Sequence, residues 1–443
     1  MNGNIPNLLT AALSEGPIEE ENCRIAVQVM NEEIKNRIKQ IRRGEVPEGY
    51  IKSRTGVSPS EWTTLRLGDI YTERKENGTA EQPILTVSIR TGGSDGALNE
   101  EELGKKVKRI EDKTQYRMAK SGDLVFNMMR AWQGSIGVVR SDGIVSPAYI
   151  VATPNSKVYP LFMDYFMKTP QMINTIHRQS YGVMDFRLRL YWDSFSPIDC
   201  AIPSVAEQKK IAAIFAIQDK VIELKEKRIF EKQRQKKYLV QQLLTGKIHI
   251  SGFNGEWVNP KASEVFRNIT NKKHNGDLEV LSATQERGVV PRSEVDIDIK
   301  YDSASLTGYK KIEKGNFVIS LRSFQGGIEY SNYEGLVSPA YTVLTPCVPI
   351  ADDFYKQFFK SGDYIRRLSV AIYGIRDGKQ IGYDDFGRIR IPYPPLEEQR
   401  AIANVFNTID HEIELLQKEL EAEKQKKKAL MQLLLTGIVR VKV

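Results

Sequence analysis

Cysteine and histidine are scarce in this sequence, with three and four copies among 443 residues. Cys23, Cys200 and Cys347 show no paired spacing, which excludes a disulfide framework and a zinc module and is typical of a reducing compartment. We therefore predict that each is a small, buried side chain. The histidines are equally scattered and have no metal-ligand spacing, so we predict no metal site.

Long hydrophobic runs are also absent. No apolar stretch approaches the roughly 20 residues that span a bilayer, and no basic flank leads into an apolar signal core. We expect a cytoplasmic protein without membrane contact. Hydrophobic residues make up 41% of the chain and aromatic residues 9%, as in globular proteins, and the length predicts two or more domains. The net charge of +8 permits a polyanionic partner.

The common enzyme signatures are missing as well. The segment LLTGKI lacks the upstream glycine and the following Ser or Thr of a phosphate-binding loop. No Asn-Pro-Pro-Tyr-like stretch indicates a built-in methyltransferase. Asp298 and Lys300 form a nuclease-like Asp-x-Lys pair, but such alternating charges are more often solvent-facing. We therefore predict no catalytic residue and no bound cofactor, and expect recognition rather than turnover.

What the sequence does contain is an internal repeat. The pentapeptide VSPAY occurs at 145–149 and again at 337–341. The two segments that end in LLTG, at 243–246 and at 434–437, align over about 40 residues without a gap. The dipeptide EW opens both copies, and YGVMD in the first parallels YGIRD in the second. The chain is therefore a head-to-tail duplication, with a period far above the roughly 20–50 residues of solenoids.

Each copy ends in a predicted helix of about 39 residues, or roughly 58 Å. Apolar residues recur every seven positions along it, which is coiled-coil-type spacing, and in the second copy Glu423 and Lys427 interrupt the seam. Ser204 and Glu207 form a capping-box pattern at the first helix start, whereas Pro395 replaces the serine in the second. The glycine of each LLTG is typical of a C-cap.

These patterns predict an α+β fold of two mixed α/β domains separated by two long antiparallel coiled-coil-like helices, with pseudo-twofold duplication. The alternative is that each helix packs only onto its own domain. A further helix is expected at 24–43. The expected boundaries are a helical leader 1–46, domain 1 at 47–202, helix 1 at 203–247, domain 2 at 248–393 and helix 2 at 394–443.

Arginine and glutamine residues beside loops are the candidate DNA contacts, because Arg can bind guanine and Gln can bind adenine through paired hydrogen bonds. Arg-x-aromatic-Gln occurs in both copies, with Trp132 and Phe324 as the aromatic residues. The alternatives are that these aromatics are core residues, that the arginines form structural ion pairs, and that any candidate contacts only phosphate or water. The candidates are Arg90, Arg130, Gln133, Arg187, Arg189, Arg287, Arg292, Arg322, Gln325, Arg376 and Lys379.

Taken together, these motifs resemble the specificity (S) subunit of Type I restriction–modification systems. The resemblance rests on PEGYIKSRTGVSPSEWTTLRLGDI at 47–70, the pairs GDLVF/GNFVI and VSPAY, and the two P-x-x-E-Q…LLTG tails. It implies two target recognition domains that each read one half of a bipartite, asymmetric double-stranded DNA target. It also implies helices that set the gap between the halves and dock two methyltransferase (M) subunits.

The cofactors implied by this resemblance belong to partner subunits. The M subunits use S-adenosylmethionine, and restriction (R) subunits, two where present, use ATP and Mg²⁺. Two other functions stay open from the residues alone. One is a non-catalytic coiled-coil scaffold that binds only protein, and the other is a self-contained nuclease with fused recognition domains.

Overall fold

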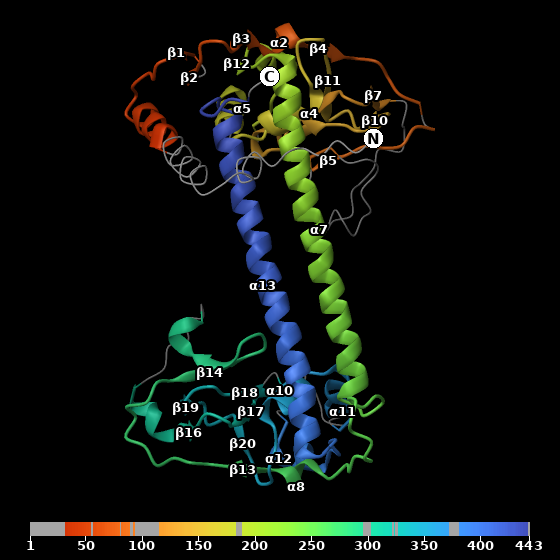
Figure 1. The fold of residues 1–443 in the computed structure, drawn as a ribbon, viewed down its shortest axis with the longest axis vertical. Coiled ribbons are helices and arrows are strands. Elements are labelled where there is room, and N and C mark those ends of the chain that lie inside the picture. The colour runs from red at the N-terminus through yellow and green to blue at the C-terminus, as the bar shows by residue number, and fades with distance from the viewer. Residues whose placement is uncertain are drawn as a thin grey trace, which may run out of the picture. The chain divides into compact units, whose positions relative to one another are not determined.

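The computed structural model describes residues 32–54, 56–79, 81–88, 92–93, 115–182, 188–295, 303–320, 323, 327–371 and 381–441. The chain divides into two compact units (Figure 1). Unit 1 comprises the described residues up to Glu223 together with those from Glu421 onwards, and unit 2 is Leu224–Leu420. Each unit combines one mixed α/β domain with a part of each of two long helices, which confirms the predicted α+β duplication.

Unit 1 is built around a four-stranded antiparallel sheet. Its elements are β1 (Tyr50–Ser53), β2 (Gly56–Pro59), β3 (Thr63–Arg66), α2 (Leu67–Ile70), β4 (Tyr71–Arg74), β5 (Val87–Ser88), β6 (Gly92–Gly93), β7 (Arg117–Ala119), β8 (Leu124–Asn127), η2 (Ala131–Gln133), β9 (Ile136–Val138), β10 (Gly143–Val145), β11 (Tyr149–Pro154), α4 (Pro160–Phe166), α5 (Pro170–Gln179), α6 (Trp192–Phe195) and β12 (Asp199–Ile202). The strand order is β4-β11-β8-β9. Phe126 of β8 packs on Phe195 of α6, with ring centroids 4.7 Å apart, and both are fully buried.

Unit 2 repeats this plan. Its elements are α8 (Ala262–Val265), β13 (Phe266–Ile269), β14 (Leu281–Thr284), β15 (Gly288–Pro291), η4 (Arg292–Glu294), η5 (Ser303–Gly308), β16 (Lys310–Ile312), β17 (Phe317–Ile319), β18 (Glu329–Tyr330), β19 (Gly335–Val337), β20 (Thr342–Pro346), α10 (Asp352–Phe359), α11 (Gly362–Ala371) and α12 (Tyr383–Arg388). The sheet order β13-β20-β17-β18 reproduces that of unit 1 strand for strand. Its core is strongly aromatic, with Phe266 in contact with the rings of Phe317 and Phe359.

The repeated VSPAY segment forms the same turn in both units. It joins β10 to β11 in unit 1 and β19 to β20 in unit 2. The Tyr149 amide donates to the Ser146 carbonyl at 2.9 Å, and the Tyr341 amide donates to the Ser338 carbonyl at 3.0 Å. The strand residues before each turn are buried, so VSPAY has a structural role in both units.

The two long helices are α7 (Val205–Leu243) and α13 (Leu396–Leu434), each of 39 residues. They contact each other in both units, and their ion pairs run antiparallel, because the partner number falls as the α7 number rises. Their first turns also enter the domain cores, through Phe215 in unit 1 and Phe406 in unit 2. The ion pairs in unit 2 are Lys225–Glu419, Lys232–Glu412 and Lys236–Asp410, at 2.6–2.7 Å.

The helix ends agree only in part with the sequence. Gly246 and Gly437 have φ of 68° and 73°, the left-handed conformation expected of C-caps. The Glu207 amide donates to the Ser204 hydroxyl at 3.3 Å, so half of the predicted capping box forms. The other half, a hydrogen bond from the Ser204 amide to the Glu207 carboxylate, is replaced, because this carboxylate accepts hydrogen bonds from Arg440.

The remaining predictions about the leader and the cysteines have mixed outcomes. Residues 32–42 are helical, as expected for the helix at 24–43, whereas residues 24–31 lie outside the described residues. Cys200 is buried as predicted, but the prediction is wrong for Cys347, which is exposed because it follows the last buried residues of β20. Cys23 lies outside the described residues. In the described part of the chain, no helix is long and apolar enough to cross a membrane.

Candidate nucleic-acid interface

The surface around η2 of unit 1 presents two of the predicted residues. Arg130 precedes this short helix and Gln133 ends it, and both side chains are exposed. Trp132 anchors the turn, because its indole N–H donates to the Met129 carbonyl at 3.1 Å and its ring meets His177 at 5.4 Å. Trp132 packs against the core as its alternative interpretation predicted. Within the described residues no acidic group pairs with Arg130, so the ion-pair alternative finds no support there.

A second strip of chain extends this surface. The Leu190 amide donates to the Met128 carbonyl at 2.9 Å, which holds residues 189–191 beside the Arg130 loop. Tyr181 and Arg189 exchange two backbone hydrogen bonds of 3.0 Å, and the Arg189 guanidinium donates to the Tyr191 hydroxyl at 3.4 Å. The rings of Tyr181 and Tyr191 lie 5.3 Å apart. We call Met129, Arg130, Gln133, Tyr181, Arg189 and Tyr191 the unit 1 patch.

The unit 1 patch has the chemistry of a nucleic-acid contact. It combines two arginines and an amide, which can bind base edges or phosphates, with exposed aromatic rings that can stack on bases. Tyr181 is 51% exposed and Met129 is 46% exposed, so both side chains can contact a ligand. Desolvation and the nearby Asp193 raise the pKa of Tyr181, so its hydroxyl remains a donor at neutral pH.

In unit 2 the predicted residues Arg287 and Arg292 belong to one hairpin, β14–β15. Arg287 lies in its turn and is exposed, and its guanidinium pairs with the Glu294 carboxylate. Arg292 follows β15 and is half-buried, with its Nε donating to the Ser282 hydroxyl at 3.1 Å. Arg287 can therefore contact DNA if a DNA group replaces Glu294 as its partner. Arg292 also stabilises the hairpin through its bond to Ser282.

The other candidates cannot be placed. Arg90, Arg187, Arg322, Gln325, Arg376 and Lys379 lie outside the described residues, as do Phe324 and the Asp298/Lys300 pair. Among the residues that are described, no group of three His, Cys, Asp or Glu side chains could hold a metal ion.

Comparison with known proteins gives one consistent family. Residues 254–424 match the family model described as Type I restriction modification DNA specificity domain. The "Putative type I restriction enzyme MjaX specificity subunit" of Methanocaldococcus jannaschii is 25% identical over 425 residues, which cover 89% of this chain and 97% of the relative. The "Type I restriction enzyme MjaVIII specificity subunit" of the same organism is 25% identical over 418 residues, covering 87% of this chain and 94% of the relative.

The chain therefore resembles specificity subunits of Type I restriction–modification systems over most of its length. A solved structure supports the fold: a chain described under "complex assembly and conformational transition of the type I R-M system" matches with a TM-score of 0.55 at 18% identity, covering 86% of this chain and 99% of the other.

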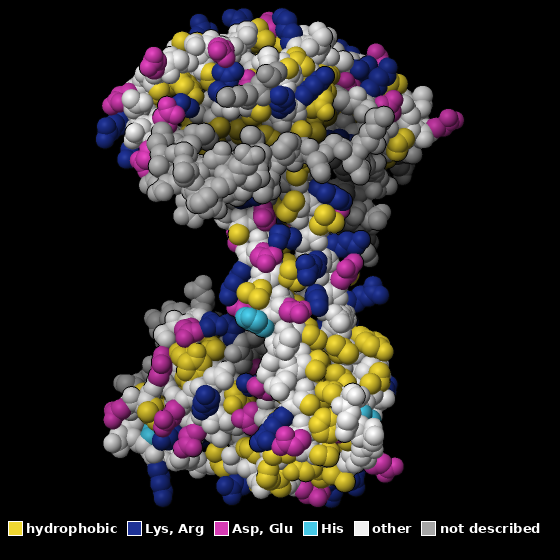
Figure 2. Space-filling model, in the orientation of Figure 1, with side chains coloured by type: hydrophobic (Ala, Val, Ile, Leu, Met, Phe, Trp, Pro, Cys, Tyr) yellow, Lys and Arg dark blue, Asp and Glu magenta, His cyan; other side chains and the backbone are white. Residues whose placement is uncertain are grey.

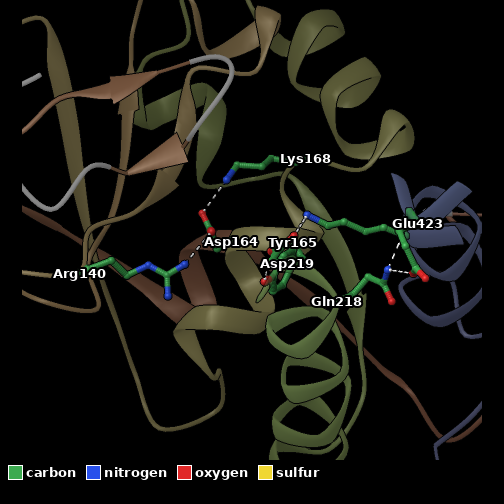
Figure 3. Close-up of polar contacts among 8 residues, drawn as sticks. Arg140, Asp164, Tyr165, Lys168, Gln218, Asp219 and Glu423 are labelled. Atoms are coloured by element: carbon green, nitrogen blue, oxygen red, sulfur yellow. Dashed lines mark hydrogen bonds and ion pairs between the residues drawn. The ribbon is translucent and has the colours of Figure 1, made fainter. Parts of the chain in front are cut away.

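In unit 1, polar residues fix the domain to the long helices (Figure 3). The Tyr165 hydroxyl of α4 donates to Asp219 of α7 at 2.7 Å, and Lys427 of α13 pairs with the same carboxylate. Burial and the Asp219 contact raise the pKa of Tyr165, so its hydroxyl stays protonated. Glu423 accepts a 2.6 Å hydrogen bond from Gln218. Both residues that interrupt the apolar seam therefore have polar partners on α7.

Figure 3 also shows how α4 is held within the unit 1 domain. Arg140 and Lys168 both reach Asp164, at 3.2 and 3.0 Å, and the Val138 amide donates to the same carboxylate at 3.0 Å. Asp164 is only 6% exposed. These contacts tie α4 to strand β9, so the helix that carries Tyr165 has a fixed place against the sheet.

Unit 2 has a matching junction. Asp410 of α13 accepts from Gln357 of α10 at 3.0 Å and pairs with Lys236 of α7 at 2.7 Å. One aspartate in each unit therefore joins both helices to a domain helix. The sequence predicts that both aspartates lie on the long helices, but it does not predict these contacts, which depend on the antiparallel register.

The repeated Glu-Gln dipeptides bind the starts of α7 and α13 to neighbouring segments through their side chains. Gln208 accepts from the Tyr159 amide at 2.7 Å, and Gln399 accepts from the Ala351 amide at 2.9 Å. In unit 1 both oxygens of buried Glu207 accept from Arg440 at 2.8 Å, an ion pair that raises the pKa of Arg440. In unit 2, one oxygen of buried Glu398 contacts His249 at 2.8 Å and the other accepts from Trp257 at 2.9 Å.

Proposed function

We propose that this chain is the DNA-reading subunit of a Type I restriction–modification complex and that each unit reads one half of a bipartite, asymmetric target. The observation that carries the proposal is the duplicated domain with unlike exposed surfaces. The unit 1 patch uses Arg130, Gln133 and Tyr181, whereas the described unit 2 candidates lie on a hairpin. Different exposed side chains select different bases, so we expect the two half-sites to differ.

In this proposal the long helices set the unread gap and dock the methyltransferase subunits. Exposed apolar side chains on and beside α7 support a protein-binding role, since exposed apolar patches mark protein-interaction sites. Phe230 is 63% exposed and Tyr238 is 55% exposed. Figure 2 shows hydrophobic side chains gathered on one face of unit 2. S-adenosylmethionine, ATP and Mg²⁺ would belong to the partner subunits, and this chain would carry out no catalysis.

The decisive experiment is coexpression with a cognate methyltransferase subunit, followed by mapping of methylated adenines across the host genome. A split, asymmetric motif with a constant gap is the expected result. A stable complex that adds no methylation, beside an active control pair, would refute the proposal and favour a protein-binding scaffold. DNA affinity that is insensitive to salt would favour it too, because phosphate contacts impose a steep salt dependence.

Point variants test the role of each unit. Arg130→Ala with Gln133→Ala should relax one half-site and leave the other unchanged, with about 1–3 kcal/mol lost for each base contact. Arg66→Ala is the matched control, since Arg66 is an exposed arginine of unit 1 outside the patch. Equal losses for the patch and control variants would remove the patch from the reading surface.

Helix length tests the gap. Lengthening α7 and α13 by the same few residues should change the number of unread base pairs and keep both half-sites. A variant that keeps the gap but reads different half-sites would contradict the spacer role.

A further inference from the structure

Unit 1 contains a half-enclosed cavity of about 560 Å³ that has no role in the reading surface. It lies where the β1–β2 hairpin, α5, the segment 197–201 and the segment 435–438 meet. Its volume falls within the usual range of pockets that bind small molecules or partner side chains. The wall includes the apolar side chains of Phe166, Met172, Ile198 and Leu435.

Two of the residues that line this cavity, Ser58 and Trp62, carry a buried hydrogen-bond donor without an acceptor. Ser58 is 5% exposed and Trp62 is 4% exposed. Within the described residues, neither the Ser58 hydroxyl nor the Trp62 indole N–H has a hydrogen-bond partner. A buried donor without an acceptor costs about 1–3 kcal/mol, and native proteins contain few of them. The pair therefore indicates a missing acceptor.

The internal repeat shows what kind of acceptor suits such an indole. Trp257, the unit 2 counterpart of Trp62, donates to the carboxylate of buried Glu398 at 2.9 Å. His249 binds only one oxygen of Glu398, which leaves the other for Trp257. In unit 1 the equivalent carboxylate, Glu207, has both oxygens bound by Arg440. Trp62 has thus lost the internal carboxylate that its counterpart uses.

The charges around the cavity also favour a carboxylate. Arg54 and Arg178 line it, and Asp199, the one acidic residue of the described lining, lies 3.8 Å from Arg54. Burial raises the pKa of the lining thiol of Cys200 to about 12, so the thiol adds no negative charge at neutral pH. The apolar wall disfavours a hydrated phosphate backbone, because polar groups lose their water there without compensation.

We propose that this cavity binds a carboxylate side chain carried on an apolar segment of a partner protein. The carboxylate accepts from Ser58 and Trp62 and faces the guanidinium groups of Arg54 and Arg178, while neighbouring apolar groups of the segment cover the wall. This inference deepens the proposed function, on which it rests for the identity of the partner as a methyltransferase subunit.

The first test uses the whole chain labelled with 5-fluorotryptophan, which gives four ¹⁹F resonances because the chain has four tryptophans. Single Trp→Phe variants assign them. Octanoate, a carboxylate with an apolar tail, should shift the Trp62 resonance and leave that of Trp257 unchanged, because Trp257 already binds Glu398. Octanol should bind at least tenfold more weakly, and Ser58→Ala should weaken octanoate by about tenfold.

The second test uses the complex. Adding the cognate methyltransferase subunit should shift the Trp62 resonance, and octanoate should compete with that shift. Trp62→Phe, which keeps the aromatic ring, should weaken assembly about tenfold. Trp132→Phe is the matched control, since Trp132 supports the η2 turn and does not line the cavity.

Four outcomes overturn the inference: no Trp62 shift with octanoate, equal binding of octanol, a Trp62 shift caused by inorganic phosphate or duplex DNA, or equal assembly by the Trp62 and Trp132 variants. A complex that methylates a split target without a Trp62 shift refutes the cavity and leaves the proposed function intact. Failure of the wild-type chain to direct methylation refutes the proposed function, and the octanoate measurement still decides the ligand chemistry of the cavity.

Discussion

Arg440→Met tests the ion pair that closes the start of α7. Glu207 is 1% exposed, and both of its oxygens depend on the Arg440 guanidinium at 2.8 Å. Methionine preserves much of the apolar stem but leaves the carboxylate with only a 3.5 Å contact from the Val441 amide. Breaking a fully buried pair costs about 3–5 kcal/mol. The Arg440 side chain is 33% exposed, which lowers our expectation to about 3 kcal/mol.

Amide hydrogen exchange is the appropriate assay, since a chain with two units need not unfold in a single step. A loss of about 3 kcal/mol corresponds to exchange about 100-fold faster at the start of α7 and the end of α13. Amides of unit 2 should be unaffected. Arg400→Met is the matched control, because the Arg400–Glu397 pair is exposed and should contribute under about 1 kcal/mol.

The reasoning fails if Arg440→Met and Arg400→Met cause the same loss of stability. A second check uses the Glu207→Gln background, in which the buried carboxylate is replaced by a neutral amide. There, Arg440→Met should cost under about 1 kcal/mol. A full loss in that background would assign the effect to packing instead of to the unpaired carboxylate.

Three further predictions concern single side chains. Asp410→Ala should destabilise unit 2 by about 1 kcal/mol and release Lys236, measured by urea unfolding; an unchanged midpoint would contradict the junction. Iodoacetamide at pH 8 should alkylate Cys347 quickly and Cys200 only after denaturation, because burial raises the pKa of the Cys200 thiol to about 12. Burial raises the pKa of Glu329, so the folded state holds this proton more tightly than the unfolded state and stability falls as pH rises above about 4. Glu329→Gln should remove that fall in the protection of β18 from hydrogen exchange, and an identical pH profile would refute it.

The sequence predicted the architecture well, because its evidence is periodic and repeated. The heptad spacing extends over dozens of residues, and the same turn residues occur in both VSPAY segments. What it could not predict are contacts between distant positions. Glu423 and Lys427 look like defects in an apolar seam, and only the antiparallel register reveals Gln218 and Asp219 opposite them.

The candidate interface was less predictable for the same reason. Arg130 and Arg292 look equally suitable in the sequence, yet one is exposed and the other is half-buried against Ser282. In the sequence, Tyr181 stands out only as part of the YGVMD motif that is repeated as YGIRD. Its pairing with Tyr191 arises from a backbone bridge to Arg189 that no local pattern encodes.

The ion pair between Glu207 and Arg440 also bears on the order in which the two units are completed during synthesis. Unit 2 is one continuous stretch, so a ribosome that has passed Leu420 has already made all of it. Unit 1, although its domain is made first, waits for residues 421–441 before α7 gains its helical neighbour and Glu207 its cation. A nascent chain that stalls in between contains every residue of unit 2 but lacks part of unit 1. Translation therefore completes the two halves in the reverse of their order along the chain.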